Sequence, residues 1–251
     1  LGANGKVGLG IVQALVEARR PLVAVADDSR ELADLAAAHP GADLTVLTAK
    51  VAGDADAERL AQQLRGLGRV LGAVVVPFAC EGGRGRLLDQ PASVLRRALE
   101  QDVLPQLALA RQLVPVLGEA GRAGRYLFVL GPGSELPWAG YGYRSITSAA
   151  LRMLARVLHD EARCVAVRVQ MLAVEAPVSS EPRSEHECAE WPSTLAVGRR
   201  AVQLLERDSP ASTDAVIQFE AGVDSAPSRT ISTGGGRSDA RSVLANLNVR
   251  R

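Results

Sequence analysis

Hydrophobic residues along the chain alternate between short continuous runs and longer segments with helical spacing. Residues 22–26 form an unbroken apolar run, which is typical of a strand covered on both faces. Ahead of this run, Ile11, Val12 and Leu15 recur at the spacing that places side chains on one face of a helix. This alternation predicts βαβ units wound around a parallel sheet.

The same alternation continues to about residue 219. Strands are predicted at residues 22–26, 44–48, 72–78, 126–130, 165–172 and 215–219, and helices at 8–19, 29–39, 54–67, 93–117, 146–158 and 193–206. Pro105 should bend or interrupt the longest helix, because proline cannot donate a helical hydrogen bond. We therefore expect a single α/β domain over residues 1–225, with a doubly wound parallel sheet of the Rossmann type.

Two segments depart from this pattern. Residues 179–192 are polar and rich in glutamate, and we expect them to form a surface loop beside the substrate. Residues 226–251 are rich in glycine, serine and arginine, a composition that predicts a flexible tail.

Composition excludes several classes of function. The chain is 47% hydrophobic and 23% charged with a net charge of +1, so electrostatics gives no reason to expect binding to nucleic acid or an anionic membrane. No apolar run reaches the roughly 20 residues of a membrane span. The three cysteines are widely spaced and the three histidines lack metal-ligand spacing, which predicts reduced thiols, no metal site and a cytoplasmic protein.

A glycine-rich turn precedes the first predicted helix. Gly2, Gly5 and Gly8 stand three residues apart. Glycine permits a positive φ and a close approach of the backbone to a phosphate, and the N–H groups at the start of a helix favour an anion. A doubly wound fold places such a turn after a buried central strand, so we expect residues of that strand to precede Leu1 in the natural protein.

An acidic residue stands where a dinucleotide site needs one. Asp27 ends a predicted strand 19 residues past Gly8 (27 − 8), about the spacing at which a carboxylate binds the ribose hydroxyls of adenosine. A carboxylate there favours NAD and repels the extra phosphate of NADP, although Lys6 leaves NADP open. The alternative interpretation is that the acidic residues after the strand only cap the next helix.

Taken in order, these segments resemble the short-chain dehydrogenase/reductase superfamily as far as about residue 205. The resembling segments are residues 2–8 (the cofactor turn), 71–80 (the strand ending in Asn-Asn-Ala-Gly), 98–103 (the helix with an active-site Asn), 126–131 (the strand before the catalytic Ser), 141–151 (the Tyr-x-x-x-Lys helix) and 176–179 (the turn at the nicotinamide). The resemblance implies short-chain dehydrogenase topology and cofactor contacts from Gly2, Asn4, Gly5, Val7, Gly8, Asp27, Ala79 and Val178.

The catalytic lysine of the family is missing, because no lysine follows Lys50. If Tyr143 is the family tyrosine, Thr147 takes the place of the lysine. If the alanines at 149 and 150 set the register instead, Arg144 takes the place of the tyrosine and Ser148 that of the lysine. Both registers leave the active site degenerate.

Other family residues are replaced as well. Residues 77–80 read Pro-Phe-Ala-Cys in place of Asn-Asn-Ala-Gly, and Asp102 replaces the active-site Asn. The serine position falls at Gly131 or Pro132, and the nearest hydroxyl is that of Ser134.

Tyr143 and Ser134 are accordingly the candidate catalytic residues. Without a nearby lysine a phenol stays protonated at neutral pH, so Tyr143 could donate a proton in carbonyl reduction but would be a poor base for alcohol oxidation. The alternative interpretation is that Tyr143 packs at the start of a helix and Ser134 lies in a turn.

Three functions stay open at this stage. The first is an NAD(P)-binding homologue that does not run the standard reaction and acts as a partner subunit or regulator. The second is an active reductase of a small carbonyl substrate that uses Tyr143, and the third is a structural domain without cofactor. The resemblance also implies a homodimer or homotetramer formed through the long helices near residues 93–117 and 143–161.

Overall fold

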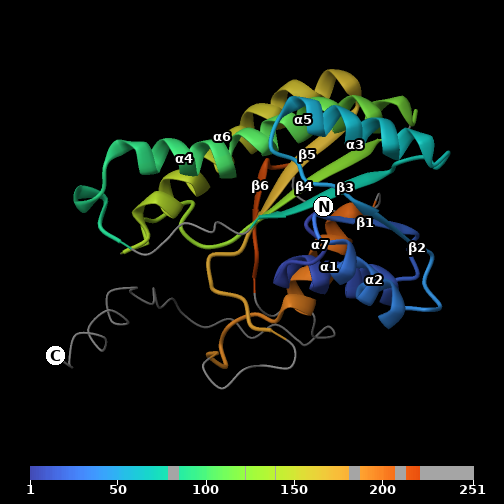
Figure 1. The fold of residues 1–251 in the computed structure, drawn as a ribbon, viewed down its shortest axis with the longest axis horizontal. Helices are drawn as coiled ribbons and strands as arrows, with labels where there is room; N and C mark the ends of the chain where they lie inside the picture. Colours follow the sequence, from blue (N-terminus) through green and yellow to red (C-terminus); the bar gives the residue numbers. More distant parts are fainter. Residues whose placement is uncertain (79–84, 122, 139, 181–186, 207–212, 221–251) are drawn as a thin grey trace, which may run out of the picture. The chain divides into compact units, whose positions relative to one another are not determined.

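The computed structural model describes residues 1–78, 85–121, 123–138, 140–180, 187–206 and 213–220. All strands in this part of the chain run parallel (Figure 1). One sheet pairs β1 with β2, and the other has the order β3-β4-β5-β6. The strands are β1 (Leu22–Ala26), β2 (Leu44–Thr48), β3 (Ala73–Phe78), β4 (Gly124–Leu130), β5 (Val167–Ala173) and β6 (Val216–Gln218).

Helices cover both faces of the strands (Figure 1). The helices on one face are α3 (Asp54–Gly66), α4 (Ala92–Asp102), α5 (Leu104–Glu119) and α6 (Gly142–Glu161). Those on the opposite face are α1 (Lys6–Glu17), α2 (Ser29–Ala38) and α7 (Thr194–Leu205). Short 3₁₀ turns occupy Leu87–Asp89 and Ala162–Val165. The predicted doubly wound α/β fold is therefore confirmed.

The predicted break in the longest helix occurs just ahead of Pro105. Helix α4 ends at Asp102 and α5 begins at Leu104, with Val103 between them at φ −102° and ψ −47°. Pro105 is the second residue of α5, where a missing N–H costs nothing because the first N–H groups of a helix have no helical partner.

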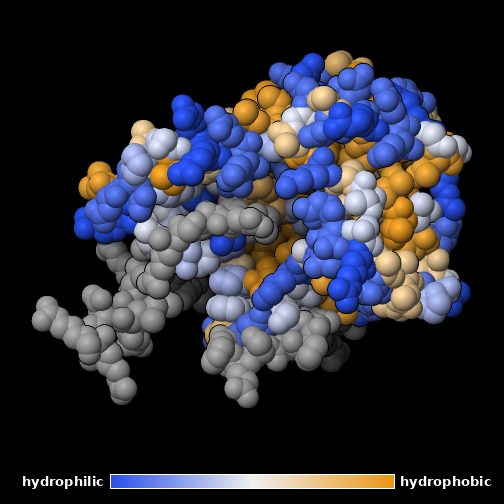
Figure 2. Space-filling view, viewed as in Figure 1, coloured by the Kyte–Doolittle hydropathy of each residue, from blue (hydrophilic) through white to orange (hydrophobic). Residues whose placement is uncertain are grey.

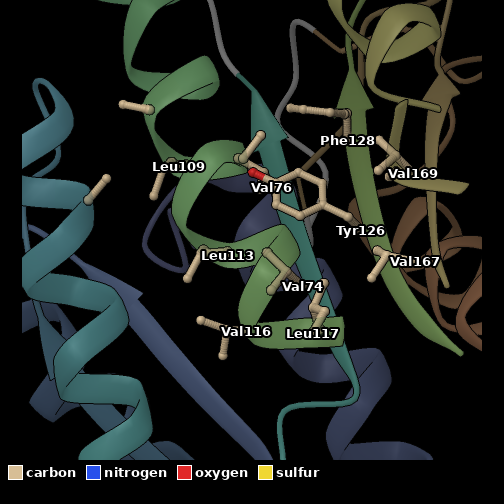
Figure 3. Packing of buried hydrophobic residues seen from close by; sticks show 14 of the residues in the cluster. Val74, Val76, Leu109, Leu113, Val116, Leu117, Tyr126, Phe128, Val167 and Val169 are labelled. Atoms are coloured by element: carbon tan, nitrogen blue, oxygen red, sulfur yellow. The ribbon is translucent and has the colours of Figure 1, made fainter. Parts of the chain in front are cut away.

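Strand β4 lies at the centre of the larger core, and all seven of its residues are buried. Side chains alternate across the sheet, as strand geometry requires. Tyr126 and Phe128 face α5, where they pack with Leu113 among others (Figure 3). Leu127 and Val129 face the opposite side and join the cluster around α1 and α7. This double burial explains why the strand is a continuous apolar run in the sequence.

The segment ahead of α1 lies between the two sheets. The Leu1 amine donates a hydrogen bond to the Val75 carbonyl oxygen of β3 at 2.9 Å, and the Ala3 amide donates to the Val25 carbonyl oxygen of β1 at 3.0 Å. A cavity of about 1030 Å³ separates β1 from β3 and is lined by residues of both strands.

Hydrophobic residues are exposed at the edge of the strands between the two helix layers. Figure 2 shows hydrophobic residues between the two helix layers, on the side where Figure 1 shows β1, β2 and the start of β3. Val70, just ahead of β3, is one of the exposed apolar residues. Of the helices described, none combines the length and the apolar character that crossing a membrane requires.

Candidate dinucleotide and substrate site

The glycine turn at the start of the chain folds tightly on itself. Gly2 has φ +62°, and the amide of Gly5 donates to its carbonyl oxygen at 3.2 Å. A Cβ at Gly8 would lie only 2.0 Å from that same oxygen, so any side chain at position 8 would force the turn open. The turn therefore requires glycine at both positions.

The glycine turn leads directly into α1, whose first backbone N–H groups lie beside it. Gly5 is the N-cap residue, and in the described part of the chain no side chain bonds to the cap. The first turn of α1 carries no acidic residue. Unsatisfied N–H groups and the positive end of the helix dipole favour a phosphate at such a position. The residues present fit the pyrophosphate of a dinucleotide.

Asp27 lies beside this turn at the end of β1. The Asn4 side-chain amide donates to Asp27 Oδ1 at 3.3 Å and to Glu31 Oε2 at 2.8 Å. The cap of α2 is Asp28, whose Oδ1 accepts from the amides of Arg30 and Glu31. Capping therefore uses the second aspartate and leaves the first beside the turn.

Glu31 adds a second carboxylate that the sequence reasoning missed. It stands in the first turn of α2 and shares Asn4 with Asp27. The sequence contained a signal for this carboxylate. Glu31 follows Asp27 by four residues and stands in the first turn of the predicted helix, which is close enough for both side chains to reach the same group.

Lys6 forms an ion pair with Glu187. Its Nζ lies 3.1 Å from Oε1 of Glu187, whose side chain is only 7% exposed. Glu187 also accepts hydrogen bonds from the amide and hydroxyl of Ser180. The positive charge that left NADP open in the sequence is therefore balanced by a carboxylate from the predicted substrate loop.

The carboxyl ends of β3 and β4 lie next to the glycine turn. A Cβ at Gly2 would be 3.8 Å from the carbonyl oxygen of Pro77 in β3. Phe78 is the register partner of Leu130, so Gly131, the residue after β4, lies at the same edge of the sheet. Ligands of open α/β sheets bind at this edge.

Other predicted cofactor residues are placed as follows. Val7 and Val178 both pack against the cluster between the sheet and helices α1 and α7. Ala79 lies outside the described residues.

The candidate catalytic residues Tyr143 and Ser134 are both buried, and each has its own surroundings. Tyr143 lies in the first turn of α6 and is 6% exposed. Ser134 is also 6% exposed, and its hydroxyl donates to Glu175 Oε1 at 2.9 Å and accepts from Arg152 Nη1 at 3.2 Å. Among the described residues no hydrogen bond links the two side chains. Their catalytic roles stay predictions, and the bond from Ser134 to Glu175 occupies the hydroxyl proton.

Arg152 organises a polar cluster that the sequence did not reveal. Its side chain is 11% exposed, with Nη2 at 3.2 Å from Glu135 Oε2 and Nη1 at 3.6 Å from Glu175 Oε1. Gln218 of β6 donates to the same Glu135 oxygen at 3.0 Å. The cluster ties α6 to the segments that follow β4 and β5, so Arg152 is a cation whose charge is met within the protein.

Arg144 faces the position that follows β4. A Cβ at Gly131 would lie 3.6 Å from Arg144 Nη2, so the two residues meet across the site. Ser148, one turn further along α6, is buried. Gly131, Arg144 and Ser148 are the residues that one of the two registers predicts at the places of the family's Ser, Tyr and Lys, and both registers stay predictions.

The guanidinium group of Arg144 lies over the ring of Trp138. Its Cζ lies 5.4 Å from the centroid of the Trp138 ring, and the Trp138 ring centroid is 4.7 Å from that of Tyr141. Ser145 Oγ accepts from the Trp138 amide at 2.9 Å and so fixes the loop onto α6. Within the described residues, no group of His, Cys, Asp and Glu is arranged to hold a metal ion.

Comparison with known proteins identifies the fold. No protein-family model matches the sequence, and no curated protein matches it either. An NADPH-bound short-chain oxidoreductase from Pseudomonas aeruginosa PAO1, described as containing an atypical catalytic center, is similar in structure with a TM-score of 0.75 and 18% identity, over 90% of this chain and 95% of that one.

Two further solved structures agree. An alcohol dehydrogenase from the archaeon Thermococcus sibiricus, complexed with 5-hydroxy-NADP, gives a TM-score of 0.74 at 18% identity over 91% of this chain and 97% of that one. A 7α-hydroxysteroid dehydrogenase complexed with NADH and 7-oxo glycochenodeoxycholic acid gives 0.73 at 18% identity over 88% and 91%. The chain therefore has the fold of the short-chain dehydrogenases/reductases, as the resemblance implied.

Proposed function

We propose that this protein binds a nicotinamide dinucleotide as a divergent short-chain dehydrogenase/reductase and does not run the standard Ser-Tyr-Lys reaction. The observation that carries the proposal is the turn at Gly2–Gly8, in which a Cβ at Gly8 would lie 2.0 Å from the Gly2 carbonyl oxygen. A turn this tight leaves the amides at the start of α1 open to a pyrophosphate. The NADPH, 5-hydroxy-NADP and NADH in the similar structures support the same ligand class.

The carboxylates beside the turn favour NAD over NADP. Asp27 and Glu31 both contact Asn4 and are exposed, so a 2′-phosphate placed there would meet two negative charges. Lys6 does not offset this repulsion, because Glu187 already balances its charge.

The test is a fluorescence titration of the protein with NADH and with NADPH. NADH should bind at least ten times more tightly than NADPH. Gly8→Ala should abolish binding of both, because the new Cβ displaces the turn. Gly66→Ala, at the end of α3 with nothing within 4 Å of the new Cβ, is the matched control and should bind NADH normally. Failure of the unchanged protein to bind either nucleotide would refute the proposal.

The proposed role without catalysis is that of a partner subunit or regulator in the cytoplasm. The standard proton relay is interrupted, because Gly131 offers no hydroxyl, Arg144 is no proton donor at neutral pH and Ser148 carries no charge. Exposed apolar residues on the outer faces of α5 and α6 favour self-association into a dimer or tetramer. They are Leu104, Leu107, Ile146, Met153 and Val157.

An active reductase of small carbonyl compounds is the second candidate. Tyr143 in the first turn of α6 supports it, as does the atypical catalytic center of the Pseudomonas oxidoreductase. In this case residues 179–192 would border the substrate. Following NADH oxidation with a panel of ketones separates the two candidates. If a ketone is reduced, Tyr143→Phe should lower the rate at least a hundredfold, and a variant with unchanged activity would exclude Tyr143 as proton donor.

A further inference from the structure

We propose that Arg144, stacked on Trp138, binds the carboxylate of a carbonyl-containing acid at the carboxyl edge of the sheet. The inference rests on the proposed dinucleotide site, because the same edge holds both. It names the class of ligand that the degenerate site selects.

Arg144 is half-buried, and no ion pair to its guanidinium group occurs among the described residues. Arg152, nine-tenths buried on the same helix, instead meets Glu135 and Glu175. A partly desolvated cation without a counter-ion lowers stability, and a bound anion would remove that cost.

The Nε–H of Arg144 is buried and has no acceptor in the described part of the chain. A buried donor without an acceptor is destabilising, and a bound oxygen atom would remove that cost. Guanidinium groups present paired N–H bonds in a planar fork that matches the two oxygens of a carboxylate. A neutral ketone offers only one oxygen and no charge.

Gly131 has no side chain beside Arg144, and a Cβ added there would already contact Arg144 Nη2 at 3.6 Å. The Trp138 ring, 5.4 Å from Cζ, makes a cation–π contact with the guanidinium group. Because Pro77 and Phe78 place this edge next to the Gly2 turn, a ligand on Arg144 would lie beside the proposed cofactor.

Calorimetry with two small probes of equal chain length tests the proposal. The chain should bind 2-oxobutanoate at least ten times more tightly than butan-2-one, and added NaCl should weaken only the first. Arg144→Gln should remove the preference, and Arg144→Lys should retain part of it, because lysine keeps the charge but loses the fork. Arg156→Gln, which removes an exposed arginine of the same helix, is the control and should keep the preference.

Fluorescence shows whether the probe binds at this place. The chain has two tryptophans, so Trp191→Phe leaves Trp138 as the only one. In that background 2-oxobutanoate should change the emission of Trp138. Equal affinity for both probes, an unaffected Arg144→Gln variant or a silent Trp138 would each overturn the proposal. The NADH titration of the unchanged protein is independent: if 2-oxobutanoate binds but neither NADH nor NADPH does, the dinucleotide site is refuted and this site stands.

Discussion

At the scale of single residues, the buried hydroxyl of Tyr126 affects the stability of the core. Tyr126 lies fully buried in β4, with its ring centroid 4.9 Å from that of Phe128, and belongs to the core cluster that Figure 3 shows. The hydroxyl has no hydrogen-bond partner among the described residues, and burial raises the pKa of the phenol above its usual range. The group therefore lies in the core without compensation for its lost hydration.

Tyr126→Phe should leave the free energy of unfolding unchanged or raise it by up to about 1 kcal/mol. The change removes a buried donor that makes no bond and keeps the ring that packs in the core. Urea denaturation measures the effect. Phe128→Leu in the same strand should instead lower stability by about 1–3 kcal/mol, because it removes packed volume. A loss above about 1 kcal/mol in Tyr126→Phe would show that the hydroxyl has a partner.

At the scale of elements, the crossing of α1 and α7 is set by two glycines. A Cβ at Gly10 would lie 2.2 Å from the carbonyl oxygen of Thr194, and a Cβ at Gly198 would lie 2.2 Å from the carbonyl oxygen of Gly10. The two helix backbones therefore touch. Sequence reasoning attended to Gly2, Gly5 and Gly8 and missed this pair, because a contact between helices far apart in the chain has no local pattern.

Gly10→Ala should lower the free energy of unfolding by about 1–3 kcal/mol, although alanine is the better helix former. The added methyl group forces the two helices apart against a packed core. Urea denaturation of Gly10→Ala beside Gly66→Ala checks this expectation. The second variant adds a methyl group at the end of α3 into open space, so it should be neutral or stabilising. Equal stability of both variants would mean that the helices separate without cost.

At the scale of the whole molecule, the site forms only where strands meet at one edge. The Gly2 turn lies beside Pro77 of β3, and Phe78 pairs with Leu130 of β4. Arg144 reaches this edge from the start of α6. No short stretch of sequence contains these residues together, which is why the site depends on the parallel register of β3 and β4.

The sequence by itself determined the elements and their order. The alternation of apolar runs and amphipathic segments is local, so it predicted the parallel strands, the helices around them, the break ahead of Pro105 and the glycine turn. The missing lysine was also visible, since no lysine follows Lys50.

Only the tertiary structure decided which residues meet. It places Arg144 beside Gly131, bonds Ser134 to Glu175 and pairs Lys6 with Glu187. Each of these contacts joins segments brought together by the packing of sheet and helices. A contact across a fold depends on the positions of all the elements between its partners, whereas a helix or strand depends mainly on its own residues.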